Sequence, residues 1–400
     1  MSSHRKSKKP TLAGVIFIFV VFAIYYLYPE ISNVDKNATP SPALSNPSPI
    51  TPDPITPGGI ATGTGTSSWL TVYFTNPNPP DNTSNGIDQI VIPLIEQAQK
   101  TIDVTSFDLN LPSLTDALIA ANKRGVQIRI VYDGKNGNQR LEASRTTDGK
   151  EFDAISTLQN AGVGLVDGGR SNGLMHDKMI IIDRQILFMG SWNMAYNDTF
   201  RNNNNLLKIT NPELIANYQA KFNELFIDQK FGTHAVVGAL NSQLNIYDVQ
   251  VENYFSPPDL VMEKLIAYVK NAKKSVHFMI FTFTDKDLAA ALTERYQAGL
   301  DVSGVIEDRG ASQGAFVPLF CAKVPAKVDG NKYTMHHKVL VIDENTVITG
   351  SYNFTKAADN ENDDNIIVIH DPGVAKLYLD EFNRINDISK DPKTGSITCK

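Results

Sequence analysis

The sequence predicts an α/β fold in which two similar halves, related by a pseudo-twofold axis, each form an αβα sandwich. Two observations support this. From Trp69 onward the chain reads twice, and each reading alternates helical and strand-like segments. Strands interleaved with helices place helices on the faces of a sheet. A repeat this long is a duplicated half-domain, so we expect one globular unit with halves at 69–232 and 248–388.

A segment outside this fold precedes the two halves. Residues 1–11 form a basic tail, and residues 12–28 are an uncharged run of 17 residues. As a helix, this run can cross a bilayer, and the positive-inside rule keeps the basic tail in the cytoplasm. We expect a single-pass anchor with the rest of the chain extracytoplasmic. The alternative is a cleaved signal peptide, although the bulky residues at 25–31 provide no small-x-small cleavage site.

Residues 29–68 are predicted to be a disordered linker, because 33–68 combine seven prolines with Ser, Thr and Gly. Residues 389–400 are predicted to be a C-terminal tail. The formal net charge is -6 although the N-terminal tail is basic, which argues mildly against broad, nonspecific binding to nucleic acid. Cys321 and Cys399 could form a disulfide in an exported protein or remain two unrelated thiols, and both alternatives stay open.

Each half is predicted to run helix, strand, helix, strand, loop, hairpin, helix. Apolar spacing predicts helices and buried strands at equivalent places in the two halves. The helices are Ile90–Gln99 and Leu260–Ala272, and the strands are Thr101–Phe107, Val126–Tyr132, Ser275–Phe283 and Leu300–Ile306. The offset between the halves is 174 residues through Gly125 and Gly299. It becomes 160 after a loop that is 14 residues shorter in the second half.

Each half then carries the same polar signature. An H-x-K-x4-D motif runs from His176 to Asp183 and again from His336 to Asp343, and G-S-x-N follows at 190–193 and 350–353. Two copies with a shared offset are very improbable by chance. Residues two apart on a strand leave the same face, so each histidine and lysine point together. The candidate catalytic residues are His176, Lys178, Asn193, His336, Lys338 and Asn353.

We expect the two runs of each motif to form a hairpin. Pairing Ile182 with Leu187 places His176 opposite Asn193, and pairing Ile342 with Val347 places His336 opposite Asn353. Docking the halves would bring both trios to one cleft. There the lysines and asparagines could hold the nonbridging oxygens of a phosphodiester. One histidine could attack phosphorus while the other protonates the leaving oxygen, and no metal or cofactor is required because the lysines supply the positive charge.

These motifs resemble the phospholipase D superfamily over roughly 69–386. That family includes phospholipases D, cardiolipin synthases, bacterial nucleases and tyrosyl-DNA phosphodiesterases. The resemblance implies that the six candidate residues form the active site and that catalysis passes through a phosphohistidine. The family usually has a glutamate 28 residues after each histidine, where it orients the ring. This sequence departs from that pattern, with Asn204 and Asp364 at those positions.

The departure predicts different roles for the two histidines. A carboxylate favours a protonated imidazole, so His336, if paired with Asp364, should rest as imidazolium and act as general acid. His176, if it lies beside Asn204, should stay neutral and act as nucleophile. Supporting roles are assigned to Ser191 and Ser351 of the G-S-x-N segments. Asp183 and Asp343 end strands, and turn formation is favoured for them over direct catalysis.

The reaction type is predicted more firmly than the substrate. An anchored, exported and acidic domain favours hydrolysis of phospholipid headgroups by a site formed within one chain. The alternative is an endonuclease acting on DNA or RNA, because 349–358 resembles the small bacterial nucleases of the family. A non-catalytic binding module is a minor alternative that two intact trios argue against. The loops Gly134–Met175 and Asp308–Met335 are expected to form the rim that selects the substrate.

Overall fold

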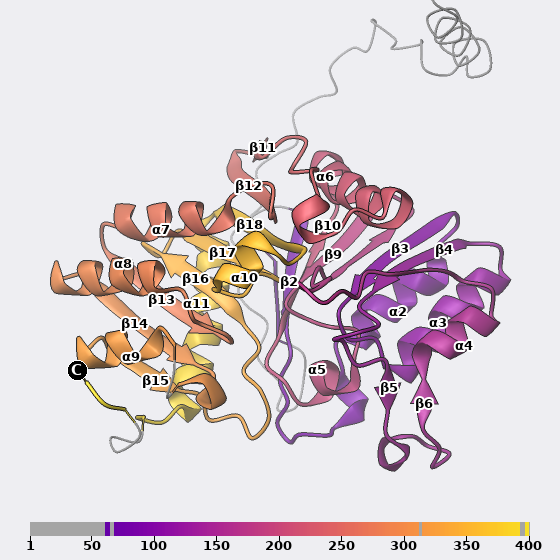
Figure 1. The fold of residues 1–400 in the computed structure, drawn as a ribbon, viewed down its shortest axis with the longest axis horizontal. Helices are drawn as coiled ribbons and strands as arrows, with labels where there is room; N and C mark the ends of the chain where they lie inside the picture. Colours follow the sequence, from indigo (N-terminus) through magenta and orange to yellow (C-terminus); the bar gives the residue numbers. More distant parts are fainter. Residues whose placement is uncertain (1–60, 65–67, 312–313, 393–396, 400) are drawn as a thin grey trace, which may run out of the picture. The chain divides into compact units, whose positions relative to one another are not determined.

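Two eight-stranded sheets with matching strand order organise the chain (Figure 1). The computed structural model describes residues 61–64, 68–311, 314–392 and 397–399. The predicted anchor at 12–28, the basic tail and most of the linker lie outside these residues. Within the described ranges, no helix has both the length and the apolar character needed to span a membrane.

The first sheet has the order β1-β2-β10-β9-β8-β3-β4-β7. Its strands are β1 Ala61–Thr64, β2 Leu70–Phe74, β3 Thr101–Ser106, β4 Gln127–Tyr132, β7 Gly164–Asp167, β8 Met179–Ile182, β9 Ile186–Gly190 and β10 Asn205–Ile209, with β5 Arg140–Leu141 and β6 Phe152–Asp153 forming a separate ribbon. The helices of this half are α2 Asp88–Gln97, α3 Pro112–Lys123, α4 Ala154–Asn160, α5 Tyr196–Phe200 and α6 Pro212–Asn223, followed by a π-helical turn at Glu224–Asp228.

The second sheet has the order β11-β12-β18-β17-β16-β13-β14-β15, so each strand has a counterpart in the first sheet. Its strands are β11 Gln243–Ile246, β12 Val249–Ser256, β13 Ser275–Ile280, β14 Asp301–Ile306, β15 Ala326–Val328, β16 Lys338–Ile342, β17 Thr346–Gly350 and β18 Asp364–His370. The helices are α7 Val261–Asn271, α8 Lys286–Gln297, α9 Phe316–Cys321, α10 Lys356–Asn360 and α11 Pro372–Ile388. Short 3-10 helices cover Thr83–Asn85, Ala143–Arg145, Gly232–His234 and Asp308–Gly310.

Alternation along each motif strand divides the packing into layers. Ile180 and Ile182 of β8 pack with residues of α2, α3 and α4, whereas Met179 and Ile181 face the opposite side of the sheet. That opposite side belongs to a core that includes residues of α6, α11 and both sheets. The helices α7, α8 and α9 cover the outer face of the second sheet (Figure 1). The predicted α/β fold of two matching halves is therefore confirmed.

The predicted hairpin register is wrong by one residue. The structure pairs Ile182 with Ile186, and Ile342 with Thr346, so each turn contains three residues rather than four. The first two residues of each turn have left-handed backbone conformations. In both halves the ladder ends before the motif histidine, and the predicted pairing of His176 with Asn193 is absent because the last paired residues are Met179 and Met189.

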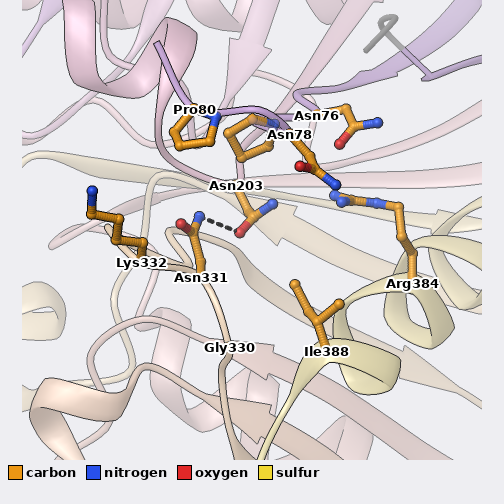
Figure 2. Close-up of a pocket in the computed structure, with 10 residues that line it drawn as sticks. Asn76, Asn78, Pro80, Asn203, Gly330, Asn331, Lys332, Arg384 and Ile388 are labelled. Carbon is orange, nitrogen blue, oxygen red and sulfur yellow. Dashed lines mark hydrogen bonds between the residues drawn. The ribbon is translucent and has the colours of Figure 1, made fainter. Parts of the chain in front are cut away.

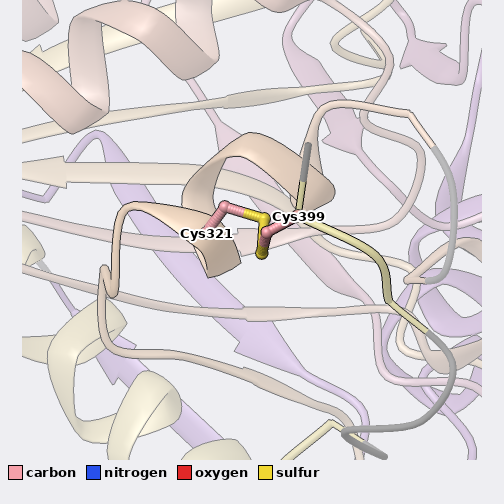
Figure 3. The surroundings of a disulfide bond; sticks show 2 residues. All are labelled: Cys321 and Cys399. Atoms are coloured by element: carbon pink, nitrogen blue, oxygen red, sulfur yellow. A yellow bond between two sulfur atoms is a disulfide. The ribbon is translucent and has the colours of Figure 1, made fainter.

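Two predicted boundaries also differ from the structure. Ala61–Thr64 lies in the expected linker but pairs with β2 as an edge strand. Its Thr and Gly residues give no hydrophobic alternation, so the sequence carries no strand signal there. The expected C-terminal tail is attached at two points, because Lys390 pairs with Val328 and Cys399 forms a disulfide with Cys321 (Figure 3). The Cα atoms of these cysteines are 5.5 Å apart.

Candidate active site

The two motif histidines meet at the junction between the halves, where each backbone segment pairs with the other half. The amide of His176 donates to the carbonyl of Asp363, and the amide of His336 donates to the carbonyl of Asn203, both at 2.9 Å. Isolated bridges join Met175 to Asp363 and Met335 to Asn203. The predicted convergence of the two trios on one site thus has a backbone basis.

The partners of the two imidazoles cross between the halves, which corrects the predicted pairing. Nδ1 of His176 lies 2.7 Å from Oδ1 of Asp364, and Nδ1 of His336 lies 2.9 Å from Oδ1 of Asn204. Spacing within one half could not reveal this, because Asn204 and Asp364 reach across the junction to the other half. The hydroxyl of Ser191 donates to Asn204 and that of Ser351 to Asp364, so both serines orient these side chains.

A carboxylate that sequence reasoning missed also contacts His336. Oδ1 of Asp198, in α5, lies 3.2 Å from Nδ1 of His336, and Asp198 is 4% exposed. Asn204 donates to the same oxygen at 3.0 Å. Nothing in the motif spacing singles out this residue, because its counterpart in the second half is Ala358.

Burial dominates the titration of both imidazoles. It lowers the pKa of His176, with Lys178 adding to this effect and Asp364 opposing it. Burial, followed by the charge of Lys338, lowers the pKa of His336 to about 3 despite the opposing effect of Asp198. In the absence of substrate His336 is therefore neutral near pH 7, and the expectation that it rests as imidazolium is wrong.

The two motif lysines are buried and similarly held. Nζ of Lys178 donates to the carbonyl of His176 at 2.8 Å, and Nζ of Lys338 donates to that of His336 at 2.7 Å. They lie 5.8 Å and 4.7 Å, respectively, from the ring centroids of Phe107 and Phe281. Burial lowers the pKa of Lys178 to about 8 and lowers that of Lys338 well below its usual range. Both ammonium groups would gain from an anion placed between them.

The two motif asparagines differ in their surroundings. The Nδ2 group of Asn193 lies 3.4 Å from Asp198, and its Oδ1 lies 3.4 Å from the backbone nitrogen of Asp108. Within the described part of the chain, Oδ1 of Asn353 is buried and has no hydrogen-bond partner. The carboxamide of Asn353 is therefore the less committed of the two.

Acidic residues at the ends of two central strands support the motifs. The carboxylate of Asp133 accepts the amide of Met175, and that of Glu307 accepts the amide of Met335. These residues are counterparts at the 174-residue offset, a signal that could have identified them. Asp183 binds the amides of residues 99–101 and Asp343 those of 273–275, in agreement with the turn-forming role favoured for both.

The middle residue of each H-x-K points away from the site, as strand alternation predicts. His337 contacts Glu381 of α11 at 2.9 Å, and Asp177 accepts a hydrogen bond from Asn365. Burial raises the pKa of the Asp177 carboxyl to about 7. These contacts anchor the back of each motif strand.

Two pockets adjoin the site. One, of about 390 Å³, is lined in part by Asn203 and Asn331, which hydrogen bond to each other and to the segment that carries His336 (Figure 2). Another, of about 290 Å³, includes Phe281, whose ring packs 4.7 Å from His336. None of the six candidate residues lines either pocket. Among the residues that the structure describes, no group of three or more His, Cys, Asp or Glu side chains could hold a metal ion.

The chain is similar to known proteins over both halves. The family described as cardiolipin synthase, PLD-like domain, matches residues 91–226 and 265–386. A phospholipase D of Rickettsia prowazekii is 30% identical over 151 residues, which are 36% of this chain and 73% of that protein. The structure of the phospholipase D family member Nuc from Salmonella typhimurium is 30% identical and covers 36% of this chain and 99% of its own, with a TM-score of 0.35.

A phosphatidylserine synthase of Haemophilus influenzae shares the fold over a longer stretch. It is 14% identical, has a TM-score of 0.58, and the match covers 76% of this chain and 84% of that one. The family match includes both motif histidines and both motif lysines. The chain therefore belongs to the phospholipase D superfamily and is a phosphoric diester hydrolase of the phospholipase D type.

Proposed function

We propose that this enzyme hydrolyses phospholipid headgroups without a metal, through a phosphohistidine intermediate. The observation that carries the proposal is the crossed pairing of two buried imidazoles at the junction of the halves. Asp364 and Asn204 engage Nδ1 of His176 and His336, and in the described residues no hydrogen bond engages either Nε2. Two buried ammonium groups share this junction. This is a site for one nucleophile, one acid and an anionic substrate.

His176 is the proposed nucleophile, for a reason that differs from the sequence-based one. As Nε2 bonds to phosphorus, positive charge develops on the ring, and an adjacent carboxylate stabilises that charge. Asp364 lies 2.7 Å from Nδ1 of His176, and its carboxyl pKa remains low because the imidazole and lysine charges outweigh the effect of burial. The intermediate therefore forms where a carboxylate directly contacts the ring.

His336 is the proposed general acid. The negative charge of a bound phosphodiester raises the pKa of a neighbouring imidazole, which allows His336 to carry a proton in the complex. As the bond between phosphorus and the leaving oxygen breaks, that oxygen takes the proton from Nε2 of His336. Water then attacks the phosphohistidine and gives a proton to His336, which restores both rings.

The lysines and asparagines are proposed to hold the nonbridging oxygens. Lys178 and Lys338 are each 1% exposed, so their charges are little screened by solvent. The free carboxamide of Asn353 can donate to one of these oxygens. The two ammonium groups supply the positive charge that the transition state requires.

Phospholipid is favoured over nucleic acid by the acidic net charge of -6 and by the name of the similar Rickettsia phospholipase D. An endonuclease is the second candidate, supported by the 30% identity to Nuc over a stretch about as long as one half. We also propose a single-pass anchor at 12–28 that keeps the catalytic halves extracytoplasmic. The disulfide supports an oxidising compartment, and both trios in one chain support a monomeric active site.

The test is an assay of the full chain in detergent, with EDTA, against phosphatidylcholine vesicles, DNA and RNA. We expect headgroup release, no cutting of nucleic acid and no effect of EDTA. Cutting of DNA or RNA without headgroup release would make the endonuclease the correct function. Loss of all activity in EDTA would contradict the metal-free mechanism.

The histidine roles are tested with bis(p-nitrophenyl) phosphate, whose leaving group needs little help from an acid. His336→Ala should still release a burst of nitrophenol approaching one per site, because His176 can be phosphorylated. His176→Ala should give no burst. A burst from His176→Ala alone, or a trapped phosphopeptide that contains His336, would reverse the assignment.

A further inference from the structure

The carboxylate of Asp198 lies where the first half lacks the expected acidic residue. In α5 its Oδ1 is 3.2 Å from Nδ1 of His336, and its Oδ2 accepts from Nδ2 of Asn193 at 3.4 Å. The amide of Asn204 donates to Oδ1 at 3.0 Å. Asp198 therefore contacts one predicted catalytic residue from each half, although no motif includes it.

The equivalent place in the second half is arranged differently. Ala358 of α10 replaces Asp198, and Asp364 replaces Asn204. There Asp364 contacts His176 directly at 2.7 Å. Each imidazole thus has one carboxylate within 3.2 Å of Nδ1, but the two carboxylates come from positions that are not equivalent.

Asn204 alone does not provide that charge to His336. Its Oδ1 is fixed as an acceptor, because its Nδ2 donates to Asp198 and the hydroxyl of Ser191 donates to Oδ1. A neutral amide can select the Nδ1–H tautomer of His336, but it stabilises an imidazolium far less than a carboxylate does. Only the combination of Asn204 and Asp198 provides both the tautomer and the charge.

We propose that Asp198 is the positioning residue of His336 and supplies, from α5, the carboxylate that Asn204 lacks. This inference rests on the proposed function, in which His336 must carry a proton while substrate is bound. The other charges that act on His336 are those of Lys338 and Lys178, which oppose its protonation, so Asp198 is the carboxylate that favours it. Its removal should weaken proton donation to the leaving oxygen.

The test compares Asp198→Ala with the double variant Asp198→Ala/Asn204→Asp, which reproduces the Ala358 and Asp364 arrangement in the first half. Asp103→Ala is the control, because Asp103 is a buried aspartate of the same half that pairs with Arg129. Two quantities are measured in each protein. One is kcat against pH on the substrate that the wild type cleaves. The other is the pKa of His336 in its complex with inorganic phosphate, from NMR of 15N-histidine-labelled protein.

For Asp198→Ala we expect kcat to fall by roughly 10- to 100-fold. The alkaline limb of the kcat profile and the pKa of His336 should both move to lower pH. The double variant should recover most of the kcat and return both quantities toward wild type. Asp103→Ala should lower the thermal midpoint but leave the alkaline limb unmoved.

An unchanged His336 pKa in Asp198→Ala would overturn the proposal. It would also fail if the double variant recovers neither folding nor the pKa, since Asp198 would then be a structural residue. If Asp198→Ala does not fold but the double variant folds and is active, a carboxylate at 204 is sufficient and the proposal stands. An inactive wild type would contradict the proposed function, whereas the NMR measurement would still decide the role of Asp198.

Discussion

At the scale of single residues, the sequence identified the six candidate catalytic side chains but not their partners. The H-x-K spacing determines which side chains share a face of a strand, so His176 and Lys178 could be predicted from local geometry. The contacts of Asp364 with His176 and of Asp198 with His336 cross the junction between the halves. No spacing within one half encodes such a contact. The sequence therefore predicted the residue types of the site, while the docking of the halves determines their pairing.

The charge of Lys178 should make ligand binding depend on pH. Its pKa is lowered to about 8, so the free enzyme loses this positive charge as the pH rises through that value. Dimethyl phosphate keeps one negative charge over this range, and its binding should weaken above about pH 8 by up to about tenfold per pH unit. The inhibition constant of dimethyl phosphate, measured from pH 6 to 10, tests this.

A matched control for this titration is Lys123→Met, which removes an exposed lysine at the end of α3. It should leave the pH dependence of the inhibition constant unchanged. Lys178→Met should weaken binding at pH 6 and flatten the curve near pH 8. An inhibition constant that is constant up to pH 10 in the wild type would contradict the prediction.

At the scale of elements, the sequence placed helices and strands well and their register less well. The predicted strands at Val126–Tyr132 and Leu300–Ile306 correspond to β4 Gln127–Tyr132 and β14 Asp301–Ile306. The hairpin register was wrong because it depends on the length of the turn, and hydrophobic alternation alone does not determine that length. The three-residue turn is stabilised by Asp183, which binds three amides of another segment. That contact is long-range and has no local signal.

The end of β17 should tolerate no side chain at Gly350. A Cβ there would lie 2.2 Å from the backbone oxygen of Asn365, which would push β18 away from β17. Gly350→Ala should therefore lower the free energy of unfolding by about 1–3 kcal/mol. It should also reduce kcat, because Ser351 and Asp364 flank the contact and orient His176. Chemical denaturation and steady-state kinetics measure the two effects.

Gly310→Ala serves as the control, since an added Cβ at Gly310 would have no atom within 4 Å. Its free energy of unfolding should stay within about 0.5 kcal/mol of the wild type. Equal destabilisation of both variants would mean that the contact between β17 and β18 is not the cause.

At the scale of the whole molecule, duplication was predictable and the shared core was not. Repeated motifs at fixed offsets identified two halves, but apolar residues in a sequence do not reveal which of them face the other half. In the structure one core includes Val72 and Tyr218 of the first half together with Phe255 and Tyr378 of the second. The polar junction with His176 and His336 joins the same two halves. The halves should therefore unfold together rather than one after the other.

The disulfide and the tryptophans allow this coupling to be measured. Cys321 and Cys399 are joined in the second half across 78 residues, whereas the two tryptophans, Trp69 and Trp192, are both buried in the first half. Cys399→Ser should lower the free energy of unfolding by about 2–4 kcal/mol. Because the halves share a core, the denaturation midpoint from tryptophan fluorescence should fall as much as the midpoint from circular dichroism.

Cys321→Ser and the double variant should match Cys399→Ser, since all three remove the same bond. If the fluorescence midpoint stays at the wild-type value while circular dichroism becomes biphasic, the halves unfold independently. In that case the junction would contribute little to stability, and the crossed contacts of His176 and His336 would be contacts between two separately stable units. A single shifted transition instead means that the active site forms only when both halves are folded, which is the arrangement that the crossed hydrogen bonds require.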